Sequence, residues 1–234
     1  MIKNLSVFFP AYNEEKNIEN TVTKAEQVLK TLKLVAYEII IINDGSKDNT
    51  GKIADELAKN ENIKVIHHNP NKGYGEALKS GFYNAKYDWI VFTDSDGQFD
   101  FSEVTNFIEK QEESGADLVI GYYKKRQVGF LTKITTKLFW EPVVFILFGF
   151  RVKDIDCAFK LISKKVIDTI PRLEATRGAF ISSELLVKVK RAGFKIVEIG
   201  ITHHERKLGW GTSRSLSVII NSYLDLLKLW WKLH

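Results

Sequence analysis

The chain has 234 residues, of which 44% are hydrophobic, so it can bury a large core, and a disordered or fibrous protein is excluded. Cys157 is the only cysteine, which excludes a disulfide framework and a thiolate zinc site and suits a small buried side chain. The net charge of +5 is unevenly divided between the two halves of the chain. Residues 1–120 carry 13 basic and 20 acidic side chains, whereas residues 121–234 carry 21 basic and 9 acidic ones. The second half is therefore expected to bind anions, and the candidates are nucleic acid, phosphorylated substrates and an anionic membrane surface.

The first segment, MIKNLSVFFPAYNE, has an apolar run too short for a signal peptide, so it predicts a strand followed by a polar loop. The most apolar stretch, PVVFILFGF at 142–150, is far shorter than the roughly 20 residues that span a bilayer. Neither secretion nor a transmembrane helix is expected.

Short β-rich runs alternate with helix-length segments through the first half of the chain. Helices are predicted to begin near Glu15, Thr50, Gly75 and Ser102, and the strands are LSVFF, YEIIIIN, IKVIHH, WIVFTD and ADLVIGY. This alternation predicts an α/β fold with a mostly parallel, Rossmann-like sheet and helices on both faces. Ligands of such sheets bind beyond the carboxyl ends of the strands. The polar clusters that fall there are PAYNEE, NDGSKDNT, HNPNKGYGEA and TDSDGQFD.

Beyond Gly121 the pattern changes to basic residues interleaved with bulky apolar ones, and Pro142 is expected to separate two short helices. A helix near 183–192 and a strand KIVEIGI follow. Residues 215–234 form a predicted amphipathic helix. Its polar stripe is Asn221, Asp225, Lys228 and Lys232, and its apolar stripe is Leu216, Ile220, Leu224, Leu227 and Trp231.

Asp94 and Asp96 follow the strand WIVF, and residues two apart on an extended strand point to the same side, roughly 7 Å apart. Mg²⁺ and Mn²⁺ take one or two carboxylates together with substrate phosphates and waters. The pair therefore suggests a metal that bridges the protein to a diphosphate, with helix capping as the alternative. Asp100 is interpreted as a loop or capping residue.

The other loops have weaker patterns. Asp44 lies where a base or ribose would be held, whereas the residues from Asp48 to Thr50 are interpreted as helix caps. Pro10, Tyr12 and Glu14 form either a wall for a nucleoside or an ordinary loop. GYGEA is weak as a phosphate motif, because the lysine and serine of a P-loop are missing.

PAYNEE, NDGSKDNT, NKGYGEALKSGF and TDSDGQFD, in this order, resemble the motifs of family 2 glycosyltransferases of the GT-A fold. The resemblance is to the polyprenyl-phosphate sugar transferases similar to dolichyl-phosphate mannose synthase. It is strong over residues 4–121 and looser to about residue 214. It implies a GT-A domain at 1–214, with a nucleotide-sugar-binding half at 1–121 and an acceptor-binding half at 122–214, followed by the helix at 215–234.

The resemblance also implies roles for individual residues. The donor nucleotide-sugar is assigned to Pro10, Ala11, Tyr12, Glu14, Asp44, Asp94 and Ser95. The metal, Mg²⁺ or Mn²⁺, is assigned to Asp94, Asp96 and Gln98, and the catalytic residues are Asp96 and Arg206. The acceptor phosphate is assigned to Lys133, Lys137, Arg206 and Ser213.

The chain departs from the family pattern in two places. QxxRW is absent, which argues against a processive polysaccharide synthase. RKLGWGTS is longer than the usual spacing, so which glycine and serine take the family roles stays open.

The expected function is inverting, metal-dependent transfer of a hexose from a GDP- or UDP-sugar to a polyprenyl phosphate. A phosphate acceptor is already ionised and needs no general base, so Asp156 and Glu184 are either acceptor-orienting or structural. Transfer to a non-lipid glycan and a catalytically silent nucleotide-sugar-binding module are the alternatives. The expected location is peripheral, on the cytoplasmic face of the membrane, with a separate membrane subunit as a candidate partner and no nucleic acid.

Overall fold

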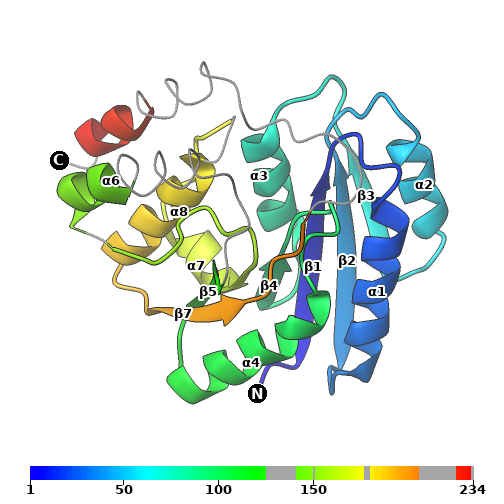
Figure 1. Ribbon diagram of the computed structural model, residues 1–234, viewed down its shortest axis with the longest axis horizontal. Helices are drawn as coiled ribbons and strands as arrows, with labels where there is room; N and C mark the ends of the chain where they lie inside the picture. Colours follow the sequence, from blue (N-terminus) through cyan, green and yellow to red (C-terminus); the bar gives the residue numbers. More distant parts are fainter. Residues whose placement is uncertain (125–140, 150, 177–179, 206–224, 233–234) are drawn as a thin grey trace.

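The computed structural model describes residues 1–124, 141–149, 151–176, 180–205 and 225–232. Its centre is one seven-stranded sheet with the strand order β3-β2-β1-β4-β6-β5-β7 (Figure 1). The strands are β1 (Asn4–Ala11), β2 (Ala36–Asn43), β3 (Ile63–His67), β4 (Trp89–Phe92), β5 (Leu118–Tyr123), β6 (Lys160–Ser163) and β7 (Ile196–Ile201). The predicted boundary after Gly121 falls inside β5.

All described strand pairs are parallel except those made by β6, which runs antiparallel to both β4 and β5. The predicted α/β fold with a mostly parallel sheet is confirmed. Because β6 is reversed, its first residue, Lys160, pairs with Phe92, the last residue of β4. The start of β6 therefore lies at the sheet edge where the ligand is expected.

Helices cover both faces of the sheet, as predicted. They are α1 (Ile18–Thr31), α2 (Thr50–Leu57), α3 (Tyr74–Asn84), α4 (Val104–Ser114), α6 (Glu141–Phe148), α7 (Lys164–Thr169) and α8 (Phe180–Arg191), with the short 3₁₀ helix η1 (Phe101–Glu103) before α4. Residues 225–232 are also helical. Pro142 is the second residue of α6, at a helix start where proline is tolerated.

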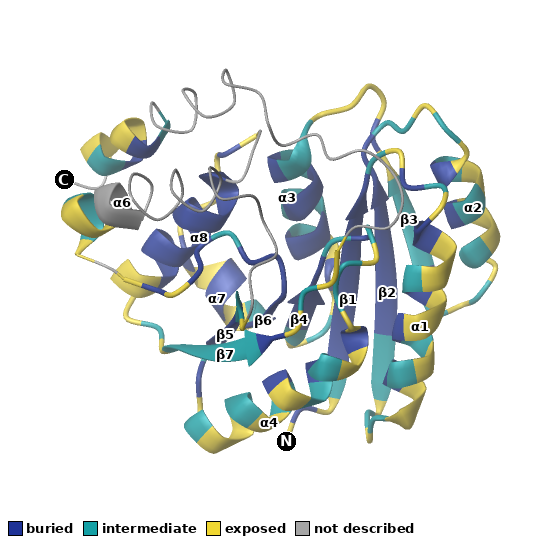
Figure 2. Cartoon of the chain, viewed as in Figure 1, coloured by how far each residue is buried: buried dark blue, intermediate teal, exposed yellow. Residues whose placement is uncertain are grey.

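Two hydrophobic cores, one on each face, explain the continuous apolar strands. Ile39 and Ile41 of β2 enter the core that α1, α2 and α4 cover, and Ile40 and Ile42 enter the core that α3, α7 and α8 cover. Successive side chains of a strand point to opposite faces, so a strand buried on both sides needs apolar residues at every position. Figure 2 shows β1 and β2 buried over most of their length.

The helix α3 lies unusually close to β1. A Cβ atom added at Gly81 would lie 2.3 Å from the ring of Phe8, so only glycine allows this approach. The Phe8 ring stacks on Phe92 at 5.3 Å between centroids and meets Phe82 edge-on at 5.1 Å. This aromatic group fixes the position of α3 relative to the ends of β1 and β4.

Two details at helix ends agree with the sequence. The Asp100 side chain accepts a hydrogen bond from the Ser102 N–H at 3.0 Å, which confirms its capping role. Asp48 likewise accepts from the Thr50 N–H at 3.0 Å at the start of α2.

The helix at 225–232 packs differently from its predicted stripes. Leu226 and Leu229 are buried in the core, whereas Leu227 and Trp231 of the predicted apolar stripe are exposed. The residues of that stripe before 225 lie outside the described residues. No helix in the described part of the chain combines the length and the apolar character needed to cross a bilayer.

Candidate active site

The loops that follow β1, β2 and β4 are joined to one another at the carboxyl edge of the sheet. The Glu14 N–H donates to Thr50 Oγ1 at 2.8 Å, which joins the first loop to the start of α2. The Ser95 hydroxyl donates to the Pro10 carbonyl oxygen at 2.8 Å, which joins the loop after β4 to the end of β1. These two bonds join three of the four polar clusters, and the N–H groups of Lys72 and Gly73, which donate to Asp44, join the fourth.

The predicted nucleoside wall is only partly made of accessible side chains. Pro10 and Ala11 are buried at the end of β1, so only their backbone atoms are available to a ligand, and their side chains hold the start of the loop in place. Tyr12 is half-buried. The Glu14 carboxylate is buried and accepts a hydrogen bond from Asn17 Nδ2 at 2.7 Å. Within this group Tyr12 is the side chain with most surface left for a ligand.

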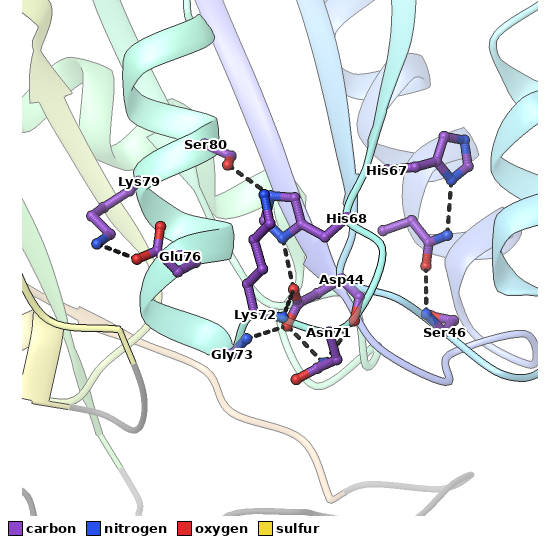
Figure 3. A network of polar contacts seen from close by, with 11 residues as sticks. Asp44, Ser46, His67, His68, Asn71, Lys72, Gly73, Glu76, Lys79 and Ser80 are labelled. Atoms are coloured by element: carbon purple, nitrogen blue, oxygen red, sulfur yellow. Dashed lines mark hydrogen bonds and ion pairs between the residues drawn. The ribbon is translucent and has the colours of Figure 1, made fainter.

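Asp44 is the centre of a buried polar network (Figure 3). Its Oδ1 accepts from the Lys72 N–H at 2.9 Å and lies 2.6 Å from His68 Nδ1. Its Oδ2 accepts from Asn71 Nδ2 at 2.8 Å and from the Gly73 N–H at 2.9 Å. A carboxylate has about four acceptor positions, and these donors occupy them. Asp44 therefore shapes the loop that leads into α3, and its predicted contact with base or ribose stays a prediction.

The Asp94 carboxylate lies half-buried beyond the end of β4, and Tyr74 reaches it from the start of α3. The Tyr74 hydroxyl donates to Asp94 Oδ1 at 2.9 Å. Burial, together with the charge of Asp96, raises the pKa of Asp94 to about 7, although the Tyr74 hydrogen bond and the Lys160 charge oppose the rise. Because the charges of these two neighbouring carboxylates repel each other, a cation bound between them would be favoured.

Asp96 and Gln98 close the loop after Asp94. The Asp96 Oδ1 accepts from the Gln98 N–H at 3.1 Å. The Gln98 side chain, predicted as a metal ligand, donates through Nε2 to the His204 carbonyl oxygen at 2.9 Å, and the His204 N–H donates to the Gln98 carbonyl oxygen at 2.8 Å. Phe99 forms a β-bridge with His203. The acidic loop, residues 94–100, is thereby bound to His203 and His204.

Four of the predicted site residues lie outside the described residues. They are Lys133, Lys137, Arg206 and Ser213. His204, which is hydrogen-bonded to Gln98, lies two residues before Arg206. The structure therefore places the residues that lead into the segment 206–224.

Lys160 is a buried cation that sequence reasoning missed. Its Nζ donates to the Cys157 carbonyl oxygen and lies 5.3 Å from the centre of the Phe92 ring. Burial lowers the pKa of Lys160, and the negative charges of Asp156, Asp154 and Asp94 oppose that change. A lysine inside the otherwise apolar run AFKLI was the available signal.

Cys157 is buried, as expected. Burial raises the pKa of its thiol to about 12, so the thiol stays protonated near neutral pH. The structural interpretation of this cysteine is thus supported.

Glu184, which the sequence left open, is engaged in a structural network. Its carboxylate accepts from the N–H groups of Glu174 and Ala175, each at 2.8 Å, and from Lys188 Nζ at 2.6 Å. Glu184 and Lys188 are both buried. The pair connects α8 to the segment before it, and this accounts for Glu184 without a catalytic role. The Asp156 N–H donates to Asp154 Oδ1 at 3.2 Å. Whether the Asp156 carboxylate orients the acceptor substrate or is structural stays open.

The donor set at Asp94 and Asp96 fits a hard divalent ion. Within the described residues no three His, Cys, Asp or Glu side chains gather into a metal-holding group. Mg²⁺ and Mn²⁺ do not need such a group, because phosphate oxygens and waters complete their shell. The buried Thr93 hydroxyl, directly before Asp94, also lacks a hydrogen-bond partner within the described part of the chain. A polar ligand at this edge would suit both features.

Comparison with known proteins gives the family. The model of Glycosyl transferase family 2 matches residues 6–170. The chain is 32% identical over 225 residues to a dolichyl-phosphate beta-glucosyltransferase of Saccharomyces cerevisiae, covering 86% of this chain and 67% of that protein. It is 28% identical over 228 residues to an undecaprenyl-phosphate 4-deoxy-4-formamido-L-arabinose transferase of Proteus mirabilis, covering 97% and 67%.

A solved structure shares the fold. Glucosyl-3-phosphoglycerate synthase from Mycobacterium tuberculosis, in complex with Mn²⁺, UDP and phosphoglyceric acid, superposes with a TM-score of 0.70 at 20% identity. The match covers 97% of this chain and 78% of that one. It supports the GT-A architecture predicted from the motifs.

Proposed function

Because the chain belongs to glycosyl transferase family 2 and is a glycosyltransferase, we propose that it transfers a hexose from a GDP- or UDP-sugar to a polyprenyl phosphate, with inversion at the sugar carbon. The carboxylate pair of Asp94 and Asp96, beside the joined loops after β1 and β2, is the observation that carries the proposal. The names of the yeast and Proteus relatives, which specify dolichyl phosphate and undecaprenyl phosphate, support the acceptor.

In this proposal Asp94 and Asp96 hold Mg²⁺ or Mn²⁺. The ion, when bound, supplies Lewis-acid stabilisation of the diphosphate leaving group. The Mn²⁺ and UDP in the structure of the mycobacterial synthase support this choice of ligand class.

The protein's own residues position the donor and the acceptor. The Asp44 network holds the loop before α3, Tyr12 offers its ring at the nucleoside end, and Ser95 keeps the acidic loop against β1. Arg206 is proposed as the cation that assists the diphosphate, and Lys133, Lys137 and Ser213 as contacts of the acceptor phosphate. An ionised phosphate oxygen attacks without a general base, which is consistent with a Glu184 carboxylate occupied elsewhere.

The first test supplies purified protein with labelled UDP- and GDP-sugars, Mn²⁺ or Mg²⁺, and a polyprenyl phosphate. Label is expected to enter the lipid fraction with one class of donor and to stay out of it when EDTA is present, because the leaving diphosphate then lacks its cation. Radioactivity in extracted lipid measures the transfer. Transfer to a soluble glycan but not to the lipid would overturn the acceptor assignment, and nucleotide-sugar binding without any transfer would favour the silent binding module.

Peripheral membrane binding is the second part of the proposal. An apolar corner of the molecule is formed by Phe145 and Ile146 of α6 and by Leu227 and Trp231, which are between 47% and 77% exposed. Figure 1 shows both helices at the end of the molecule that carries the C-terminus. Leu147, Phe148, Leu226 and Leu229 anchor these helices on one core cluster, so their outward residues are held in place.

Basic side chains at this apolar corner suit an anionic lipid surface. The Arg151 guanidinium lies 5.7 Å from the centre of the Phe145 ring. Lys228 and Lys232, beside Leu227 and Trp231, are exposed although they pair with Asp225 and Glu174, and long basic side chains at such positions can reach lipid headgroups. The proposal places this corner on the cytoplasmic face of the membrane, with a separate membrane subunit as a candidate partner.

Replacing both Ile146 and Trp231 with glutamate is expected to abolish co-flotation with liposomes that contain anionic lipid, because two charges would replace the exposed apolar side chains that are proposed to enter the lipid. Flotation on a sucrose gradient, with the protein quantified in each layer, measures the binding. Val35→Glu is the matched control, since Val35 is 78% exposed in the segment between α1 and β2, away from the apolar corner. Unchanged flotation of the double variant would contradict the membrane assignment.

A further inference from the structure

Tyr74 is the first residue of α3 and contacts the acidic loop from a different element of the fold. Its ring packs against the core cluster on the α3 face of the sheet, and its hydroxyl donates to Asp94 Oδ1 at 2.9 Å. From the sequence, GYGEA was weak as a phosphate motif and formed part of the family motif NKGYGEALKSGF, but Tyr74 received no role of its own. The structure shows that its tyrosine reaches a predicted metal ligand 20 residues further along the chain.

The backbone on either side of Tyr74 is held on two sides. The preceding N–H, of Gly73, donates to Asp44 Oδ2 at 2.9 Å. On the other side a Cβ at Gly75 would lie 2.6 Å from the Ala175 carbonyl oxygen, and the Glu76 N–H donates to the Thr176 carbonyl oxygen at 3.3 Å. The start of α3 is therefore confined between the Asp44 network and the segment that Glu184 organises.

Asp94 meets two different neighbours. Tyr74 contributes a neutral donor from α3, and Lys160 contributes a positive charge from β6. A neutral donor orients a carboxylate without cancelling its charge, whereas a cation competes with a metal for that charge. Hydrogen bonds of this kind to a metal-ligating carboxylate commonly change metal affinity about 10- to 100-fold.

We propose that Tyr74 is a positioning residue of the metal site: its hydroxyl fixes the orientation of the Asp94 carboxylate and thereby sets the affinity for the divalent ion. The inference rests on the proposed function insofar as that function places the ion at Asp94 and Asp96. Tyr74 lies within the motif NKGYGEALKSGF, but no role was assigned to it from the sequence. Tyr74 acts through its hydrogen bond to Asp94.

Tyr74→Phe removes the hydroxyl and keeps the ring. The variant is expected to bind Mn²⁺ about 10- to 100-fold more weakly in the presence of UDP or GDP. The electron paramagnetic resonance signal of free Mn²⁺ gives the binding constant without any sugar transfer. Nucleotide binding in EDTA, followed by isothermal titration, is expected to stay unchanged, because the loop contacts of Asp44 remain.

Tyr83→Phe is the matched control on the same helix. The Tyr83 hydroxyl accepts from the Leu173 N–H at 2.9 Å, so this variant also loses one hydroxyl contact of α3 but is expected to keep the Mn²⁺ affinity of the original chain. The midpoints of thermal unfolding of the two variants show how much stability each substitution removes. Equal Mn²⁺ affinity in Tyr74→Phe and Tyr83→Phe would overturn the role of Tyr74. Failure of the unaltered chain to bind Mn²⁺ with either nucleotide would overturn the metal assignment itself, and the role of Tyr74 with it.

Discussion

Asp96→Asn is expected to lower sugar transfer by about 10²- to 10³-fold, the usual loss when one group that stabilises developing charge is removed. The substitution keeps the side-chain oxygen that accepts from the Gln98 N–H, so the loop after β4 should keep its shape. It removes one of the two charges that favour a divalent ion at this position. Initial rates at saturating donor and lipid acceptor measure the effect.

The stability of Asp96→Asn has a predicted sign. The charge of Asp96 raises the pKa of Asp94, which means that the two carboxylates repel each other in the folded chain. Removing one charge is therefore expected to leave the midpoint of thermal unfolding unchanged or to raise it. Asp100→Asn is the control, because Asp100 caps η1 four residues further on and its asparagine can keep that hydrogen bond. Full activity in Asp96→Asn would remove this residue from the site.

Glu184→Met is expected to lower the free energy of unfolding by about 3–5 kcal/mol, because it leaves the Lys188 ammonium buried without its carboxylate. It also removes the acceptor of two backbone N–H groups, those of Glu174 and Ala175. Urea denaturation followed by circular dichroism measures the change.

Adding Lys188→Met to Glu184→Met separates a structural role from a catalytic one. The double variant has no buried charge left over, so it is expected to regain a large part of the lost stability, while the two backbone N–H groups still lack their acceptor. A single variant as stable as the unaltered chain, yet without transferase activity, would instead assign Glu184 to the acceptor site.

The elements up to β5 were predictable because each carries its own local pattern. The four isoleucines at 39–42 are consecutive because β2 is buried on both faces, and this requirement is visible in the eight residues of the strand. The strand β6 was not predicted: it has four residues, begins with Lys160 and runs antiparallel between β4 and β5. Nothing within so short a segment specifies its partners or its direction.

The candidate site follows the same division. Asp94 and Asp96 were predicted from a spacing of two residues, which is a local property of a strand end. The hydrogen bonds of Asp44 come from donors at residues 68–73, and the contact between Tyr74 and Asp94 depends on how α3 packs beside β4. These are contacts between elements, so they required the fold. The pairing of Glu184 with Lys188, four residues apart on one helix, was within reach of the sequence.

The close packing of α3 against Phe8 at Gly81 also determines where the start of α3 lies at the candidate site. Gly81 and Tyr74 are seven residues apart, roughly 10 Å along a rigid helix. A larger residue at 81 would push α3 away from the Phe8 ring, and the same displacement would draw the Tyr74 hydroxyl away from Asp94. A glycine that faces only the hydrophobic core is thus expected to influence the metal affinity proposed for Asp94 and Asp96, and a genetic screen for metal-dependent defects should recover substitutions at position 81.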